Sequence, residues 1–251
     1  MSNQMRTAIV TGGGSGIGRA VGVALCAAGW TVVLAGRKVE TLEQTRQLAQ
    51  GSGLIETHVA DVTDDASVEQ LFDAVVERYG RLALLFNNAG INVRPVPLDQ
   101  LSTAELRSII ATNLLGSFLC ARAAFRVMKA QTPQGGRIIN NGSVSAYAPR
   151  PNSAPYTATK HGITGLTKSL ILDGREFNIA CGQVDIGNAT TDLTARMETG
   201  AMQANGTTMA EPRIPAKLVA EAVVHLANLP LEANIPFVTI MASGMPLYGR
   251  G

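Results

Sequence analysis

The chain has 251 residues, of which 46% are hydrophobic and 16% are charged, and its formal net charge is only +2. A disordered chain combines low hydrophobicity with high net charge, so this composition excludes disorder and indicates a globular protein with a large core. The small positive excess and the lack of runs of like charge argue against binding to nucleic acid or to a membrane surface.

Short runs of β-branched and other apolar residues alternate with longer helical patterns along the chain. Strands are predicted at Thr7–Thr11, Thr31–Ala35, Leu54–Val59, Leu82–Phe86, Arg137–Asn140, Ile179–Val184 and Phe237–Met241. Helices are predicted at Ile17–Ala28, Val39–Gln50, Asp64–Tyr79, Thr103–Ala130, Tyr156–Asp173 and Ala216–Asn228. This alternation predicts an α/β fold with a parallel sheet covered by helices on both faces. The sequence shows no linker or repeat, so we expect residues 1–251 to form a single domain.

The cysteines and histidines indicate neither a disulfide framework nor a metal centre. Cys26, Cys120 and Cys181 are odd in number and far apart, and the histidines are equally scattered. Residues 1–6 lack the apolar stretch of a signal peptide, and Thr7–Val10 is too short to span a membrane. We therefore expect reduced cysteines in a cytoplasmic protein.

A glycine-rich turn joins the first predicted strand to the first predicted helix. It reads Thr11-Gly12-Gly13-Gly14-Ser15-Gly16-Ile17-Gly18. Glycines let the chain turn tightly and let a diphosphate approach the backbone, and the helix N-terminus offers free N–H groups and a positive dipole. Its position between strand and helix predicts a phosphate-binding loop rather than a purely structural turn. The expected cofactor contacts here are Gly12, Gly14, Ser15, Gly16, Ile17 and Gly18.

The residues after the second and third strands bear on the choice of cofactor. An acidic residue after the second strand would favour NAD, but Arg37 stands there and its guanidinium suits a 2′-phosphate. NADP(H) is therefore favoured and NAD(H) remains possible. The alternative is that Arg37 is a solvated loop residue and that Glu40, or nothing, touches the ribose. Asp61, followed by Val62, could accept the adenine amino group or cap the helix that starts near Asp64.

Tyr156 and Lys160 form the candidate chemical centre. Their spacing of four on a predicted helix places both side chains on one face. An ammonium beside a phenol favours the phenolate and is expected to lower the tyrosine pKa, so that the hydroxyl can pass a proton at neutral pH. Of the four tyrosines, only Tyr156 has a lysine four residues on.

Two further polar residues lie at positions where a site could use them. Ser143 follows a predicted strand, and its hydroxyl could hold a substrate oxygen as charge develops there, although such a serine can also be a turn residue. Asn113 lies in the middle of a predicted helix among apolar residues and needs a partner if it is buried. That partner is either a structural water or part of the site.

Together these residues resemble the short-chain dehydrogenase/reductase family, in its branch of about this length, over nearly the whole chain. The motifs are Thr11-Gly12-(x)3-Gly16-x-Gly18, Asn87-Asn88-Ala89-Gly90, Asn113, Ser143 and Tyr156-x-x-x-Lys160. The resemblance implies a single-domain Rossmann fold with a doubly wound, parallel, seven-stranded sheet. It also implies an NAD(P)-dependent oxidoreductase that interconverts a carbonyl and a secondary alcohol of a small molecule.

The resemblance further implies a role for each matched residue. Tyr156 would be the general acid in carbonyl reduction and the base in alcohol oxidation. Lys160 would hold the nicotinamide ribose and lower the tyrosine pKa, and Ser143 would orient the substrate oxygen. Asn113 would place a water that links Lys160 to solvent. The groove for the cofactor would be lined by Asn88, Ala89 and Gly90.

Two positions depart from the family pattern. Family members carry Pro-Gly after the sixth strand, where this chain has Ile186-Gly187. Gly187, Ala189 and Thr191 are then expected at the cofactor, with Thr191 where a family threonine contacts the carboxamide. The serine that usually precedes the catalytic serine is replaced here by Gly142.

The sequence says least about the substrate. Residues 190–215 are expected to form a lid over the site, and Met202 and Met209 in it are adaptable apolar side chains or packing filler, as is Met197. Arg94 and Arg150 could meet an acidic substrate, although solvated loop arginines are the simpler reading. The resemblance also implies a homotetramer or homodimer. Two alternatives remain open, an NAD-preferring enzyme of the same family and a non-catalytic NAD(P) sensor on the same fold.

Overall fold

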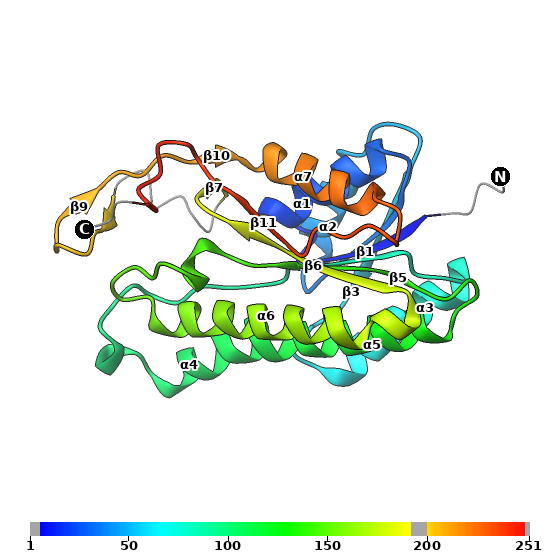
Figure 1. Ribbon diagram of the computed structural model, residues 1–251, viewed down its shortest axis with the longest axis horizontal. Coiled ribbons are helices and arrows are strands. Elements are labelled where there is room, and N and C mark those ends of the chain that lie inside the picture. The colour runs from blue at the N-terminus through cyan, green and yellow to red at the C-terminus, as the bar shows by residue number, and fades with distance from the viewer. Residues whose placement is uncertain (1–5, 192–199, 249–251) are drawn as a thin grey trace.

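The computed structural model describes residues 6–191 and 200–248, and their centre is one parallel sheet. The strand order is β11-β6-β5-β4-β1-β2-β3, which confirms the predicted doubly wound, seven-stranded sheet (Figure 1). The strands are β1 (Thr7–Thr11), β2 (Thr31–Gly36), β3 (Leu54–Val59), β4 (Leu84–Asn87), β5 (Gly136–Asn141), β6 (Ile179–Ile186) and β11 (Phe237–Ile240).

Helices cover both faces of the sheet (Figure 1). One face carries α1 (Gly16–Ala27), α2 (Val39–Arg46) and α7 (Ala216–Asn228). The other carries α3 (Asp65–Tyr79), α5 (Gly116–Ala130) and α6 (Ala154–Asp173), and α4 (Thr103–Ile110) packs against α6. Successive residues of β1 enter opposite cores, since Ala8 and Val10 pack with the first layer and Ile9 with the second. A strand buried on both faces is mostly apolar, which is why β1 and β2 show no polar alternation.

The long helix predicted at Thr103–Ala130 contains an interruption. Between α4 and α5 the chain forms a π-helical segment, η2 (Ala111–Leu115), and Asn113 lies inside it. Single-turn π segments of this kind are frequent at functional sites. The combined helix is long and apolar enough to cross a membrane, but its buried residues, such as Cys120 and Ala124, pack in the core beside α3 and the sheet.

Most other predicted boundaries agree within two residues, with one clear exception in the helices. The second helix was expected to reach Gln50, but α2 ends at Arg46. Strand β6 continues to Ile186, two residues beyond its predicted end, so that Asp185 belongs to the strand.

The expected lid region contains two small strand pairs. Strand β7 (Ala189–Thr190) pairs with β10 (Ile214–Pro215), and β8 (Ala201–Met202) pairs with β9 (Thr208–Met209). They lie beyond the carboxyl edge of the main sheet (Figure 1). Met197 lies outside the described residues. Short 3₁₀ turns complete the fold at η1 (Leu98–Gln100), η3 (Val144–Ala146) and η4 (Arg175–Phe177).

Candidate active site

A cavity of about 460 Å³ opens at the carboxyl edge of the sheet. Strand order reverses between β1 and β4, and ligands of open α/β sheets bind at such a switch point. Of the residues expected from sequence, the cavity is lined by Gly12, Ser15, Gly16, Ile17, Asn88, Gly90, Asn113, Ser143, Tyr156, Lys160, Gly187, Ala189 and Thr191. The expected residues outside the lining are Gly14, Gly18, Arg37, Asp61, Val62 and Ala89.

The glycine loop adopts a conformation that only glycine tolerates well. Gly12 and Gly16 have φ angles of +66° and +52°. A Cβ on Gly18 would lie 2.2 Å from the carbonyl oxygen of Gly12, so the start of α1 can approach the turn only without a side chain there. Ser15 is the N-cap residue of α1, and its side chain makes no capping hydrogen bond. The backbone at the helix N-terminus therefore faces the cavity without a side-chain cap from Ser15.

Asn88 and Ala89 join this loop to the end of β4. The amides of Asn88 and Ala89 donate to the hydroxyl of Thr11 at 2.9 and 3.0 Å, and the Asn88 carboxamide donates to the Thr11 carbonyl at 2.8 Å. Ala89 thus acts through its backbone, behind the cavity wall. These hydrogen bonds fix the position of the loop after β1 relative to the loop after β4.

Asp61 and Arg37 lie further along the same edge. The carboxylate of Asp61 accepts from the amide and hydroxyl of Thr63 at 2.9 and 2.8 Å, whereas Asp64 caps α3 through the Ala66 amide. The helix-capping alternative for Asp61 is therefore wrong. Burial alone would raise the pKa of Asp61, but the Thr63 hydrogen bonds and the nearby Arg37 charge lower it. Arg37 is exposed.

Three of the four expected catalytic side chains, those of Ser143, Tyr156 and Lys160, meet at the cavity. Helix α6 presents Tyr156 and Lys160 one turn apart, with the lysine Nζ 5.6 Å from the tyrosine ring centre. The Tyr156 phenol is hydrogen-bonded to the side chain of Ser143. Lys160 is 7% exposed and donates from Nζ to the Asn141 carbonyl at 2.7 Å. The lysine is thus anchored to the strand that delivers Ser143.

Burial controls the protonation of this group. It raises the pKa of Tyr156, and the Ser143 hydrogen bond and the Arg150 charge offset this only in part. The expected lowering of the Tyr156 pKa is therefore wrong in this structure. Burial also lowers the pKa of Lys160 to about 8, against the opposing effect of the Asp185 carboxylate. A buried cation loses hydration, which disfavours its charged form.

Asn113 finds its partner in the protein backbone. Its Nδ2 donates to the Ile91 carbonyl at 2.9 Å and its Oδ1 accepts from the Ile91 amide at 2.8 Å. The side chain is buried, and the residue also lines the cavity. These two bonds fasten the loop after β4 to the π segment of the long helix.

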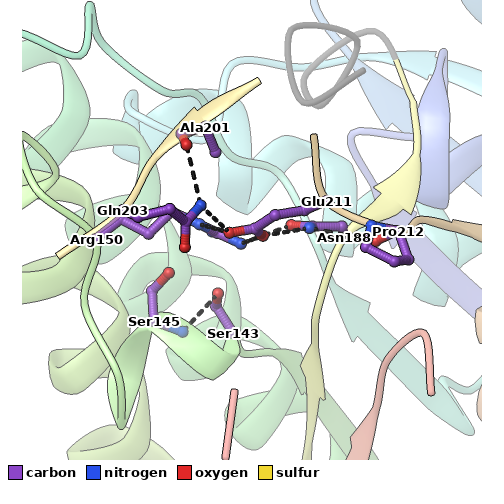
Figure 2. A network of polar contacts seen from close by, with 8 residues as sticks. All are labelled: Ser143, Ser145, Arg150, Asn188, Ala201, Gln203, Glu211 and Pro212. Carbon is purple, nitrogen blue, oxygen red and sulfur yellow. Dashed lines mark hydrogen bonds and ion pairs between the residues drawn. The ribbon is translucent and has the colours of Figure 1, made fainter. Parts of the chain in front are cut away.

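Arg150 belongs to a buried polar network that the sequence did not reveal (Figure 2). Its guanidinium pairs with the carboxylate of Glu211 and donates to Asn188 at 3.0 Å. Gln203 and Asn188 also donate to Glu211, at 3.0 and 2.8 Å. The Arg150 side chain is 14% exposed, so its reading as a solvated loop arginine is wrong. Arg94, by contrast, is half-exposed and pairs with Glu105 at 2.8 Å.

Sequence reasoning also missed two polar residues of β6. Gln183 and Asp185 are fully buried directly behind Ser143, and Asp185 accepts from the Ser143 amide at 3.0 Å. A signal existed, because polar side chains in a strand covered on both faces need partners.

At the other departure from the family pattern, Gly187 lines the cavity and its amide donates to the Ile240 carbonyl at 2.9 Å.

Comparison with known proteins places the chain among enzymes of similar fold. A family profile described as short chain dehydrogenase matches residues 6–201. Sulfoacetaldehyde reductase 2 of Chromohalobacter salexigens is 31% identical over 235 residues, 93% of this chain and 92% of that protein.

Two solved structures extend the comparison to three dimensions. The structure of levodione reductase has a TM-score of 0.84 and 30% identity, covering 94% of this chain and 96% of its own. An alcohol dehydrogenase from Thermococcus sibiricus, solved with 5-hydroxy-NADP, has a TM-score of 0.82 and 25% identity, covering 96% and 98%.

Proposed function

Because the chain belongs to the short-chain dehydrogenase family of oxidoreductases, we propose that it interconverts a carbonyl and a secondary alcohol of a small molecule with NADP(H). The observation that carries this proposal is the meeting of Ser143, Tyr156 and Lys160 at a cavity that also reaches the glycine loop. One cavity thus offers a proton donor and a place for a dinucleotide.

The residues around the cavity fit a nicotinamide dinucleotide. A Cβ on Gly18 would collide with the turn, and Gly12 and Gly16 have positive φ, so the loop is shaped for close approach by a diphosphate. Lys160 would hold the ribose next to the nicotinamide, and Gly187, Ala189 and Thr191 would flank the nicotinamide end. When bound, the nicotinamide supplies or accepts the hydride.

The protein supplies the proton and orients the substrate. The raised pKa of Tyr156 keeps its hydroxyl protonated at neutral pH, which is the form that can protonate a developing alkoxide. In the oxidation direction the same oxygen would receive the proton from the alcohol once it has itself lost its proton and become the phenolate. The Ser143 hydroxyl accepts from the Ser145 amide at 3.1 Å and is hydrogen-bonded to the Tyr156 phenol, so a bound substrate oxygen would replace the phenol as the acceptor of the serine hydrogen.

NADP(H) is preferred over NAD(H) on the strength of Arg37. This residue follows β2, where an acidic side chain would favour NAD, and its exposed guanidinium can pair with a 2′-phosphate. Asp61 is the neighbouring group for the adenine. Its Oδ1 is occupied by Thr63, so the amino group of the base would be accepted by the second oxygen.

We extend the proposal to the rest of the molecule. Residues 1–251 act as one domain, and residues 190–215 act as the substrate lid. The protein works in the cytoplasm as a homotetramer or homodimer. The exposed apolar side chains of Ile110, Leu115 and Phe118 on the long helix, with Leu172 on α6, support such an interface.

The test is a panel of ketones, aldehydes and secondary alcohols followed at the nicotinamide absorbance with NADPH and NADP⁺. Calorimetric titration of both cofactors accompanies it, because Trp30 precedes β2 at the opposite edge of the sheet and would report poorly on binding. We expect turnover and tighter binding of NADP(H). Tight binding with no turnover across the panel would overturn catalysis in favour of a sensor, and tighter NAD(H) binding would overturn the role of Arg37.

A further inference from the structure

The carboxyl group of Asp185 lies completely buried behind the catalytic residues. It accepts from the Ser143 amide at 3.0 Å, from the Gln183 carboxamide at 2.7 Å and from the Tyr147 hydroxyl at 2.7 Å. Burying a carboxylate is costly unless its oxygens are hydrogen-bonded. Three donors converge on this one, and one of them is the main chain of the serine that holds the substrate oxygen.

Gly142 and Asp185 depend on each other for space. A Cβ at position 142 would lie 2.1 Å from Oδ1 of Asp185 and 2.6 Å from Nε2 of Gln183. Contacts this short are relieved only if the Asp185 and Gln183 side chains shift, and both are fully buried and hydrogen-bonded. The serine that the family usually has at position 142 is therefore disfavoured here, because the carboxylate occupies its place.

The Asp185 charge also acts on Lys160. Tyr156 lies beside Lys160 on its own helix, the Asp185 charge on β6 acts on the lysine, and the Arg150 charge acts on Tyr156. Burial lowers the pKa of Lys160, and the Asp185 carboxylate raises it again in part. Tyr147 covers the other oxygen of Asp185, and burial together with this bond raises the Tyr147 pKa to about 12. Tyr147 therefore remains a neutral donor at neutral pH.

We propose that Asp185 is a positioning residue that fixes Ser143 through its main-chain N–H and balances the buried ammonium of Lys160, and that Gly142 is the space this carboxylate requires. The catalytic consequence rests on the proposed function, whereas the effects on Lys160 and on packing do not.

The substitution Asp185→Asn removes the negative charge at this position and keeps the shape of the side chain. The amide oxygen can still accept from Ser143 and Gln183, and the new Nδ2 can donate to the Tyr147 oxygen. Tyr147→Phe is the matched control, because it removes one hydrogen bond and keeps the charge. The titration of Lys160 in the full-length protein without cofactor is followed by NMR of ¹³C-labelled lysine side chains and assigned with Lys160→Ala.

The expected result is a pKa of about 8 for Lys160 in the wild type and a value lower by about 1 in Asp185→Asn. The pKa of Lys160 in Tyr147→Phe should stay close to its value in the wild type. An unchanged Lys160 titration in Asp185→Asn would overturn the charge balance, whether or not any substrate is found.

An activity measurement tests the catalytic consequence with the best substrate of the carbonyl panel. Protonated Lys160 supports both the ribose and the tyrosine, so loss of the Asp185 charge should move the alkaline limb of kcat/KM to lower pH. An equal fall in kcat/KM at every pH would contradict this role and leave Asp185 a structural residue only. Failure of the proposed function would appear separately, as absence of turnover in the wild type.

A double-mutant cycle tests the shared space. Gly142→Ala should lower the Tm by roughly 5 °C, because a methyl group enters an overfilled site. In the Asp185→Ala background the same substitution should lower the Tm much less, because the carboxylate that would collide with the new methyl group is gone. Equal losses in both backgrounds would overturn the steric pairing of Gly142 and Asp185.

Discussion

At the scale of single residues, the candidate site is a small set of buried groups whose protonation is controlled by desolvation. Tyr156 remains protonated and Lys160 titrates at about 8 because both have left water. Ser143 is hydrogen-bonded to the phenol, the Asn141 carbonyl accepts from the ammonium, and the Asp185 charge acts on that ammonium. The chemistry therefore depends on which side chains replace the lost water.

Tyr156→Phe tests the proton donor. Removing the hydroxyl leaves the ring and the position of Lys160 intact, so we expect kcat to fall by about 10²–10⁴-fold while the Kd for cofactor stays nearly unchanged. Turnover with the best panel substrate and calorimetric titration measure the two quantities. Retained turnover would refute the assignment of Tyr156 as general acid and base.

Arg37→Ala tests cofactor selection. One charge-assisted contact to a 2′-phosphate is worth about 1.5–3 kcal/mol, so the Kd for NADP⁺ should rise by about 10–100-fold, and the Kd for NAD⁺ should not. Calorimetric titration of both cofactors checks this. Lys38→Ala, at the adjacent exposed position, is the control. An equal change for the two cofactors would count against a phosphate contact at Arg37.

At the scale of elements, short irregular segments bring the site together. The π segment η2 turns Asn113 toward the loop after β4, and two hydrogen bonds to Ile91 join them. The Arg150–Glu211 pair joins the loop before α6 to the region of β8 and β9, and Asn188 adds the end of β6 (Figure 2). The expected lid is thus tied to the wall of the cavity by a buried charge pair.

Glu211→Gln should weaken this attachment. The Glu211 side chain is fully buried, and although burial alone would raise its pKa, the bonds from Arg150, Gln203 and Asn188 lower the pKa to about 2. Loss of the charge leaves the Arg150 guanidinium poorly paired, a change that is strongly destabilising at buried sites. We expect a lower Tm at neutral pH and faster hydrogen exchange at residues 200–212.

The same pKa sets an acid dependence whose sign can be worked out. The folded-state pKa lies below the ordinary value of 4.5, so the stabilisation is complete above that value and is lost as pH falls toward 2. The contribution is roughly 3 kcal/mol. Between about pH 4.5 and pH 2 the Tm of the wild type should therefore fall more steeply with decreasing pH than the Tm of Glu211→Gln. Glu221→Gln, in an exposed pair with Lys217, is the control, and parallel curves for Glu211→Gln and wild type would contradict the prediction.

At the scale of the whole molecule, the parallel sheet gathers distant segments at one edge. The loops that follow β1, β4, β5 and β6 all begin at this edge, because every strand of the main sheet runs in the same direction. The outer surface of the long helix and α6 carries exposed apolar side chains, and about half of the Phe118 side chain remains in contact with solvent. Such a surface is typical of a subunit interface.

Phe118→Asp should dissociate the proposed oligomer. A charge in the middle of an apolar interface would be buried without a partner, so the assembly should shift toward the monomer. Light scattering after size-exclusion chromatography measures the mass. Leu218→Asp, on α7 at the opposite face of the sheet and similarly exposed, should leave the mass unchanged. If the wild type is a monomer, there is no such interface. If the two substitutions have equal effects on the mass, the interface does not lie on this surface.

The fold class followed from the sequence, and so did the shared helix face of Tyr156 and Lys160, because both depend on local patterns. Alternating strand and helix predicts the sheet, glycines predict the first turn, and the spacing of Tyr156 and Lys160 places both on one helix face. Only the tertiary structure decided the direction of the Tyr156 pKa, the pairing of Arg150 with Glu211 and the presence of Asp185 behind Ser143. These depend on burial and on contacts between residues far apart in the chain, and neither quantity is written in a local pattern.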